Sequence, residues 1–196
     1  MSTSPVSLKD LLVAMRPEDG ASHVSVKDVL TRIGEKSFAP AILVIGLILV
    51  SPVSGIPGTP TIGSLIVVLC AVQAILGRGH LWLPGLLMRR RVSAPRMRRG
   101  IDWLRRPADW LDRHTHDRYL FLSAPPFSQL SFGLIGMVAL TWPFLELLPF
   151  VTSFGAGAVS LIAFGLMTRD GAYMIAGLGV TVALTAAATG VAIEIF

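Results

Sequence analysis

The sequence predicts an all-α integral membrane protein built from two repeated helical hairpins with proline- and glycine-broken, re-entrant-like tips. Of the 196 residues, 53% are hydrophobic and 15% charged, and the mean hydropathy is +0.67, which is too apolar for an ordinary soluble domain. Residues 39–77 carry no charge, and residues 119–168 carry only Glu146. Prolines and glycines interrupt both apolar stretches, although an unbroken helix is the usual way to cross a bilayer.

Two amphipathic helices are expected in residues 1–38, ahead of the first apolar stretch. Ser7 with Asp10 and Ser25 with Asp28 have the spacing of a capping box, in which side chains satisfy free amides at a helix start. Apolar residues then recur at helical spacing after each serine. We expect both helices to lie on the cytoplasmic side or in the membrane interface, packed on the membrane part.

The first hairpin is predicted over residues 39–79. Its apolar arms, 39–50 and 61–76, would be about 18 Å and about 24 Å long as helices, shorter than a bilayer core of roughly 30 Å. The segment between them is rich in helix breakers, so we expect the chain to fold back there. The expected tip residues are Pro52, Pro57, Gly58 and Pro60.

Residues 80–127 are predicted to form an arginine-rich cytoplasmic or interfacial connection. Eleven arginines and no lysine lie between Arg78 and Arg118. Positive loops are retained in the cytoplasm, which also places the N-terminus there and favours contact with anionic lipid headgroups over nucleic acid. Trp103 and Trp110 share a helix face at a spacing of seven and are expected to anchor in the headgroup region, with Pro107 either breaking that helix or starting a new one.

The second hairpin is predicted over residues 128–171, with Pro143 and Pro149 at its tip. An offset of 91 aligns Pro52 with Pro143 and Thr61 with Thr152, which suggests a duplicated unit in parallel or inverted orientation. Paired interrupted segments are typical of substrate or ion sites in secondary transporters, whereas the alternative is a purely structural duplication.

Residues 172–196 are predicted to form a C-terminal transmembrane helix. Small residues recur along it at Gly179, Ala183 and Ala187, a spacing that permits close helix packing. That packing is either intramolecular or the seam of a homodimer.

Glu146 is the first candidate for a substrate or ion site, because an ionisable group at membrane depth is costly unless it is paired. The alternative is that Glu146 reaches interfacial water near the tip. Gln73 is the second candidate, and an interhelical hydrogen bond is the alternative. The further candidates are Arg78, Arg169 and Asp170 at the cytoplasmic ends of the hairpins and Glu35 at the opposite start.

No enzyme signature is present, so no catalytic residue, metal site or cofactor is predicted. His114 and His116 are two residues apart, which on a helix points them to different faces. No phosphate loop and no nucleophile, histidine and acid pattern occurs.

The order of these features resembles the bacterial ExoD family of membrane proteins. The matching segments are VSVKDVLTRIGEKSF, SPVSGIPGTPTIG, AVQAILGRGHLWLP, LPF and GLMTRDG, and the likeness covers about residues 23–195. Two departures are Lys36, where the family has another basic residue, and FVTSFGAG, where it has an asparagine-containing turn. The resemblance implies an inner-membrane protein linked to exopolysaccharide synthesis and to growth under alkaline conditions.

Two functions follow as hypotheses. The first is a multi-pass inner-membrane transporter or ion-handling protein whose hairpins meet at a buried polar tip. The second is a scaffold that does not transport and instead organises exopolysaccharide machinery through its arginine-rich surface.

Overall fold

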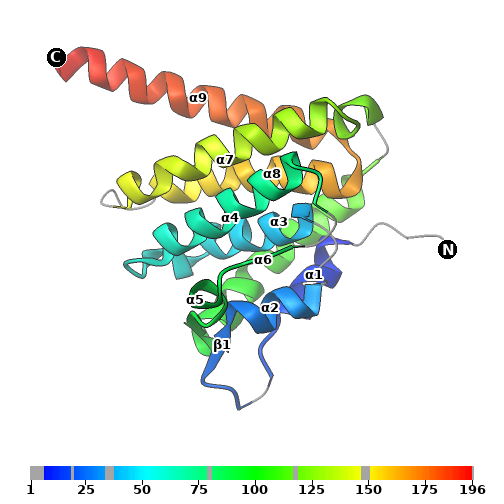
Figure 1. The fold of residues 1–196 in the computed structure, drawn as a ribbon, viewed down its shortest axis with the longest axis vertical. Coiled ribbons are helices and arrows are strands. Elements are labelled where there is room, and N and C mark those ends of the chain that lie inside the picture. Colours follow the sequence, from blue (N-terminus) through cyan, green and yellow to red (C-terminus); the bar gives the residue numbers. More distant parts are fainter. Residues whose placement is uncertain are drawn as a thin grey trace.

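The computed structural model describes residues 7–18, 20–33, 38–78, 81–116, 119–146 and 151–195. Regular structure in these residues is almost entirely helical, as predicted (Figure 1). The elements, in chain order, are α1 (Leu8–Met15), β1 (His23–Ser25), α2 (Val26–Ile33), α3 (Phe38–Val50), η1 (Pro52–Gly55), α4 (Thr59–Ile75), α5 (Gly85–Met88), β2 (Arg91–Ser93), α6 (Ala94–His114), η2 (Leu120–Ser123), α7 (Phe127–Leu145), α8 (Val151–Thr168) and α9 (Gly171–Ile195).

Four apolar helices form the centre of the molecule. α3 packs on α8 and α4 packs on α7, so the first arm of each hairpin lies against the second arm of the other. The bundle therefore has two ends. The tip end holds residues 50–61, 146 and 151–153, and the base end holds residues 73–78, 119–127 and 165–173. In Figure 1 the cyan turn after α3 and the yellow end of α7 lie together on the left, and α9 begins at the opposite end.

The break predicted in the first hairpin is confirmed. α3 ends at Val50, a 3-10 turn follows, and α4 begins at Thr59. Gly58 has φ of +86°, a left-handed conformation that a residue with a Cβ rarely adopts. Pro60 lies in the first turn of α4, where its missing N–H costs nothing.

The break predicted in the second hairpin lies later than expected. α7 continues through Pro143 to Leu145, so the assignment of Pro143 to the turn is wrong. Pro149 is outside the described residues, and Thr152, which the offset aligns with Thr61, lies in the first turn of α8.

The helix tolerates Pro143 because α4 supplies a replacement hydrogen bond. Proline has no N–H to donate to the carbonyl four residues earlier, which belongs to Ala139. The hydroxyl of Ser64, on α4, donates to that carbonyl over 2.6 Å. Pro143 therefore helps to join the two hairpins instead of ending a helix.

The two predicted N-terminal helices are confirmed as α1 and α2. Ser7 accepts a hydrogen bond from the amide of Asp10 at 3.1 Å. At the start of α2 the amide of Asp28 donates to Ser25 at 3.1 Å, and the amide of Ser25 donates to the Asp28 carboxylate at 3.0 Å. The second pair is a reciprocal capping box.

The arginine-rich connection packs with the N-terminal helices as a layer over α3. β2 pairs antiparallel with β1, with Val24 opposite Val92, a two-stranded ladder that the sequence did not predict. α6 continues through Pro107, so neither expectation for that proline is correct. Because this layer, α4 and α8 surround it, α3 is buried along nearly its whole length.

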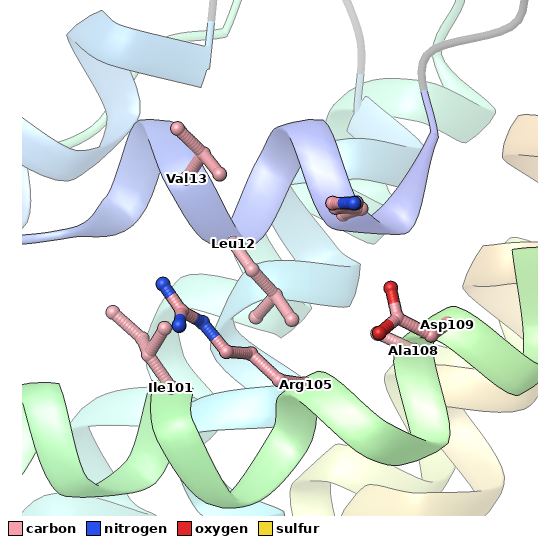
Figure 2. Close-up of a pocket in the computed structure, with 7 residues that line it drawn as sticks. Leu12, Val13, Ile101, Arg105, Ala108 and Asp109 are labelled. Carbon is pink, nitrogen blue, oxygen red and sulfur yellow. The ribbon is translucent and has the colours of Figure 1, made fainter.

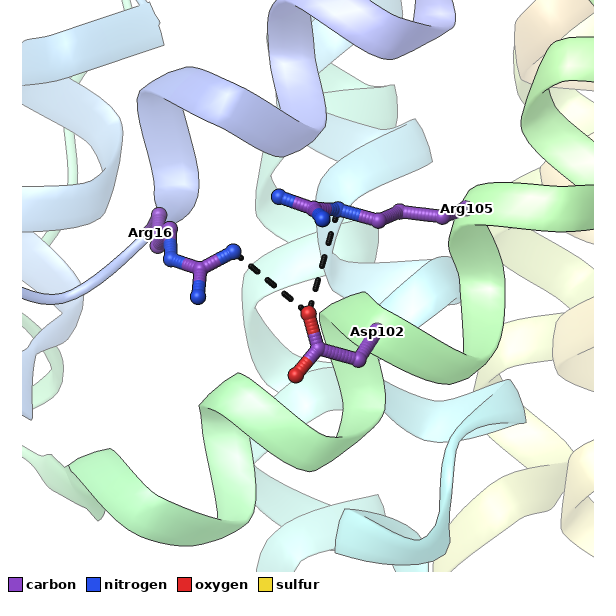
Figure 3. A network of polar contacts seen from close by, with 3 residues as sticks. All are labelled: Arg16, Asp102 and Arg105. Atoms are coloured by element: carbon purple, nitrogen blue, oxygen red, sulfur yellow. Dashed lines mark hydrogen bonds and ion pairs between the residues drawn. The ribbon is translucent and has the colours of Figure 1, made fainter.

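Polar contacts fix α1 against α6. The Asp112 carboxylate accepts from the amides of Leu8 and Lys9, both at 2.9 Å, and so caps α1 from another element. Asp102 contacts Arg16 at 3.4 Å and Arg105 at 3.8 Å (Figure 3). A cavity of about 280 Å³ remains between the two helices, beside Leu12 and Arg105 (Figure 2).

Among the described residues, α7 is long and apolar enough to cross a membrane alone. Four further helices are apolar but shorter over the residues searched, namely Phe38–Val50, Thr59–Ile75, Thr152–Thr168 and Gly171–Ala187. Large apolar side chains are exposed on α7 at Leu130, Met137, Leu140 and Phe144. One face of the bundle is therefore apolar, opposite the charged layer of α1 and α6.

Candidate functional site at the hairpin tips

Glu146 lies where the two hairpins meet. It follows the last residue of α7, and its carboxylate reaches the start of α4. One oxygen accepts from the amide of Gly58, the N-cap of α4. The other accepts from Thr61, from the hydroxyl at 2.5 Å and the amide at 3.3 Å. A residue from the second hairpin thus caps a helix of the first.

The electrostatics of this contact favour the ionised carboxylate. The amides at a helix start lack partners within the helix and carry the positive end of its dipole. The hydrogen bond from the Thr61 hydroxyl, followed by that from the Gly58 amide, lowers the pKa of Glu146, and partial burial opposes this shift. Glu146 therefore stays charged while the contact is closed.

A second polar contact lies beside the first. The hydroxyls of Ser54, after α3, and Ser153, in α8, are 3.2 Å apart. Ser153 also donates to the carbonyl of Leu49 at 3.3 Å. These contacts involve side chains that are only partly buried, and they join the same two hairpins as Glu146.

Asp170 lies at the base end, where its carboxylate accepts hydrogen bonds from backbone amides. It is 1% exposed, and its carboxylate accepts from the amide of Ala172 at 3.0 Å, which caps α9, and from the amide of His116 at 3.0 Å. Arg169 is exposed and has φ of +59°, a left-handed residue that ends α8. The amide of Asp170 then donates to the carbonyl of Gly165, which completes the helix end.

Gln73 also lies at the base end, about 22 Å from Gly58 along α4. Its side-chain nitrogen donates to the carbonyls of Trp82 at 2.7 Å and Leu69 at 2.9 Å, and its oxygen accepts from the amide of Trp82 at 2.8 Å. Gln73 thus fixes the segment after the hairpin against α4. Arg78 is exposed, and its amide closes the end of α4 on the carbonyl of Gln73.

The structure therefore brings together Glu146 and the tip residue Gly58, and it places Gln73, Arg78, Arg169 and Asp170 at the other end. Glu35 lies outside the described residues. The sequence analysis missed Thr61, Ser54 and Ser153 as tip contacts. Their signal is a set of hydroxyl side chains flanking both helix breaks, which is weak because such residues are common in turns.

Among the described residues no cluster of three or more histidine, cysteine, aspartate or glutamate side chains has a geometry that would hold a metal ion.

The fold defines a helical protein that has, among the described residues, one helix long and apolar enough to cross a membrane. The family model described as "Exopolysaccharide synthesis, ExoD" matches residues 8–190, so the chain belongs to the ExoD family. Protein ExoD of Rhizobium meliloti (strain 1021) is 29% identical over 178 residues, which cover 87% of this chain and 71% of that protein. An uncharacterized protein of Synechocystis sp. is 25% identical over 167 residues, 83% of this chain and 74% of that protein. No solved structure matches the chain.

Proposed function

We propose that this chain is a multi-pass protein of the bacterial inner membrane that supports exopolysaccharide synthesis by moving a small ion or solute between its two hairpins. The observation that carries the proposal is the Glu146 contact. The carboxylate of Glu146, from the second hairpin, accepts hydrogen bonds at the N-terminus of α4, in the first hairpin. Helix N-termini at interrupted segments are a recurring element of transport sites. Reciprocal packing of the arms supports a duplicated unit, as the sequence alignment suggested.

The chemistry of Glu146 couples opening of the tips to protonation. In the closed state its hydrogen bonds hold its pKa below the ordinary value for glutamate. When the tips separate, these donors are lost and the pKa rises, so the open state binds a proton more tightly. By linkage, a proton favours opening and opening favours a proton. This coupling suits an ion exchanger driven by protons at acidic pH, where Glu146 can be protonated.

The test uses the purified chain in liposomes loaded with a fluorescent pH indicator. An imposed Na⁺ or K⁺ gradient should produce an internal pH change that protein-free liposomes lack, and Glu146→Gln should abolish it. Asp109→Asn is the matched control, because Asp109 is an acid on α6, away from the tips. Internal pH that matches protein-free liposomes under both gradients would contradict ion transport.

A second candidate function is a scaffold for the exopolysaccharide machinery. The observation that favours it is a basic hollow of about 540 Å³ lined by Lys27, Arg89 and Arg91, between the start of α2 and the segment around α5. All three side chains are exposed, so an acidic partner surface could contact them directly. Capture of polysaccharide synthesis or export proteins by the intact chain, lost when residues 89–91 become alanine, would favour the scaffold.

A further inference from the structure

An apolar groove runs along the side of the bundle, between α6 and the pair α3 and α8. Its volume is about 440 Å³, within the range of roughly 300–1,000 Å³ that is usual for small-molecule sites. α3 contributes Leu43 and Leu47, α8 contributes Leu161, and α6 contributes Trp103 and Pro107. The lining is almost wholly aliphatic and aromatic, which suits a hydrocarbon chain better than a polar solute.

One buried polar side-chain atom without a hydrogen-bond partner among the described residues lies in this lining. The hydroxyl of Ser160 lies in the wall and has no hydrogen-bond partner, although the residue is only 7% exposed. The hydroxyl faces Gly46 of α3, where there is no room for a Cβ, so it is enclosed between α3 and α8, and the groove presents an apolar lining to a ligand.

The rim of the groove is positively charged. Trp103 is 56% exposed, and Arg99 and Arg106 lie one helical turn before and after it on the same face of α6. Both arginines are exposed, and neither has an ion pair within the described part of the chain. The opposite face of α6 is buried against the rest of the molecule. A tryptophan between arginines is the pattern of a headgroup boundary.

We propose that this groove binds an anionic phospholipid, with one acyl chain between α6 and α8 and with the phosphate held by Arg99 and Arg106. Charge complementarity selects this occupant, because a hydrocarbon lining beneath a pair of free guanidinium groups matches a lipid that is apolar at one end and anionic at the other. The proposed phosphate site lies on α6, and although Val50 and Ser153 of the tip end also line the groove, the proposal does not depend on transport. α6 would then sense the local lipid composition from the side of the bundle.

The test is quenching of tryptophan fluorescence by lipids with brominated acyl chains. The protein is reconstituted in phosphatidylcholine vesicles that contain a small fraction of brominated phosphatidylglycerol or, in parallel, of brominated phosphatidylcholine. The signal assigned to the groove is the quenching that Trp103→Phe removes. We expect about a tenfold preference for the anionic lipid, lost in the double variant Arg99→Gln and Arg106→Gln. Arg89→Gln with Arg90→Gln is the matched charge control.

A second pair of variants fills the groove. Gly157 lines it, and a Cβ there would meet its nearest neighbour, Val50, at 3.9 Å, so Gly157→Leu should obstruct the groove without a backbone clash. Leu161→Trp fills the same space one turn further along α8 and serves if the first variant folds poorly. Gly179→Leu is the control, because Gly179 has no atom within 4 Å and lies outside the groove.

The filling variants should remove the Trp103-dependent quenching, and the Gly179 variant should keep it. Equal quenching by both brominated lipids would overturn the proposal, because it would show ordinary surrounding lipid. Unchanged quenching in both filled variants would overturn it as well. Dissociation of a dimer by the filling variants would also overturn it, since a second copy would then be the occupant.

Discussion

The two ends of the bundle are held by different kinds of contact. At the base end the backbones of α8 and the start of α9 are in contact: a Cβ on Gly165 would lie 2.7 Å from the carbonyl oxygen of Asp170 and 2.9 Å from the amide nitrogen of Met174. At the tip end the contacts are side chains that reach across, namely Glu146 to α4 and Ser54 to Ser153. At the base, α9 is thus held to α8 by close packing, whereas the two hairpin tips are held to each other by a few hydrogen bonds.

This difference indicates which end can open. Moving the start of α9 away from α8 would break closely packed backbone and the hydrogen bonds of the buried Asp170 carboxylate to its two amide donors, a large cost. Separating the tip exchanges a few partly exposed hydrogen bonds for bonds to water, a small net cost. The tip contact should therefore open more readily than the base, and protonation of Glu146 can release it.

The largest expected effect is at the base. Gly165→Ala should destabilise the protein by about 2–3 kcal/mol, because the new methyl group would overlap backbone atoms that cannot move independently. Thermal unfolding in detergent measures the change. Gly157→Ala is the matched control, since its methyl group would be at ordinary contact distance, and it should cost far less. Equal losses in the two variants would contradict close backbone packing at the base.

The next effect is at the tip. Glu146→Ala should cost about 1–2 kcal/mol, the usual range for loss of a helix N-cap, because three donors of α4 lose their acceptor. The variant should also raise the rate of protease cleavage near residues 54–58 by more than its loss of global stability alone would explain. A loss as large as that of Gly165→Ala, with no local change at the tip, would show that both ends are held equally.

A pH dependence follows from the lowered pKa of Glu146. The contact contributes its full stability above the ordinary glutamate pKa of about 4.3, and that stability is lost as pH falls through the lower pKa of the folded state. Hydrogen exchange of the amides of Gly58 and Thr61, corrected for the intrinsic effect of pH, should show protection falling in this acidic window. Glu146→Gln should remove the pH dependence, and persistence of the dependence in that variant would assign it to another group.

The smallest effect concerns Thr61 alone. Thr61→Val removes the hydroxyl that donates to Glu146 but leaves the amide, so we expect a loss of about 1 kcal/mol or less and a Glu146 pKa closer to the ordinary value. Thr59→Val, two residues earlier in the same turn, is the control and should leave the pKa unchanged. A titration of Glu146 by carbon NMR compares the two variants, and equal shifts would exclude a specific role for Thr61.

The sequence predicted features that depend on neighbouring residues. The serine and aspartate pairs at positions 7 and 10 and at 25 and 28 predicted both N-terminal helix starts, because a capping box needs only a four-residue spacing. Prolines and glycines after Val50 predicted the first break for the same local reason.

Features that depend on distant partners could not be predicted in this way. Local rules place Pro143 in a turn, but Ser64 on another helix satisfies the carbonyl that the proline leaves free. The partner of Glu146 is 85 positions away at Thr61, and that of Asp112 is 104 positions away at Leu8. Hydrophobic periodicity carries no information on such pairs. Glu146 could therefore be recognised as an acid in an apolar run, but the helix that it caps could not be predicted.

The central claim is that the tips separate during transport, and a disulfide that joins them tests it most directly. The hydroxyls of Ser54 and Ser153 are 3.2 Å apart, so cysteines at these positions should form a disulfide in a protein whose Cys70 is replaced by alanine. After reconstitution, oxidation should abolish the ion-dependent internal pH change, and reduction should restore it. Transport at the same rate in the oxidised and reduced states would contradict the claim.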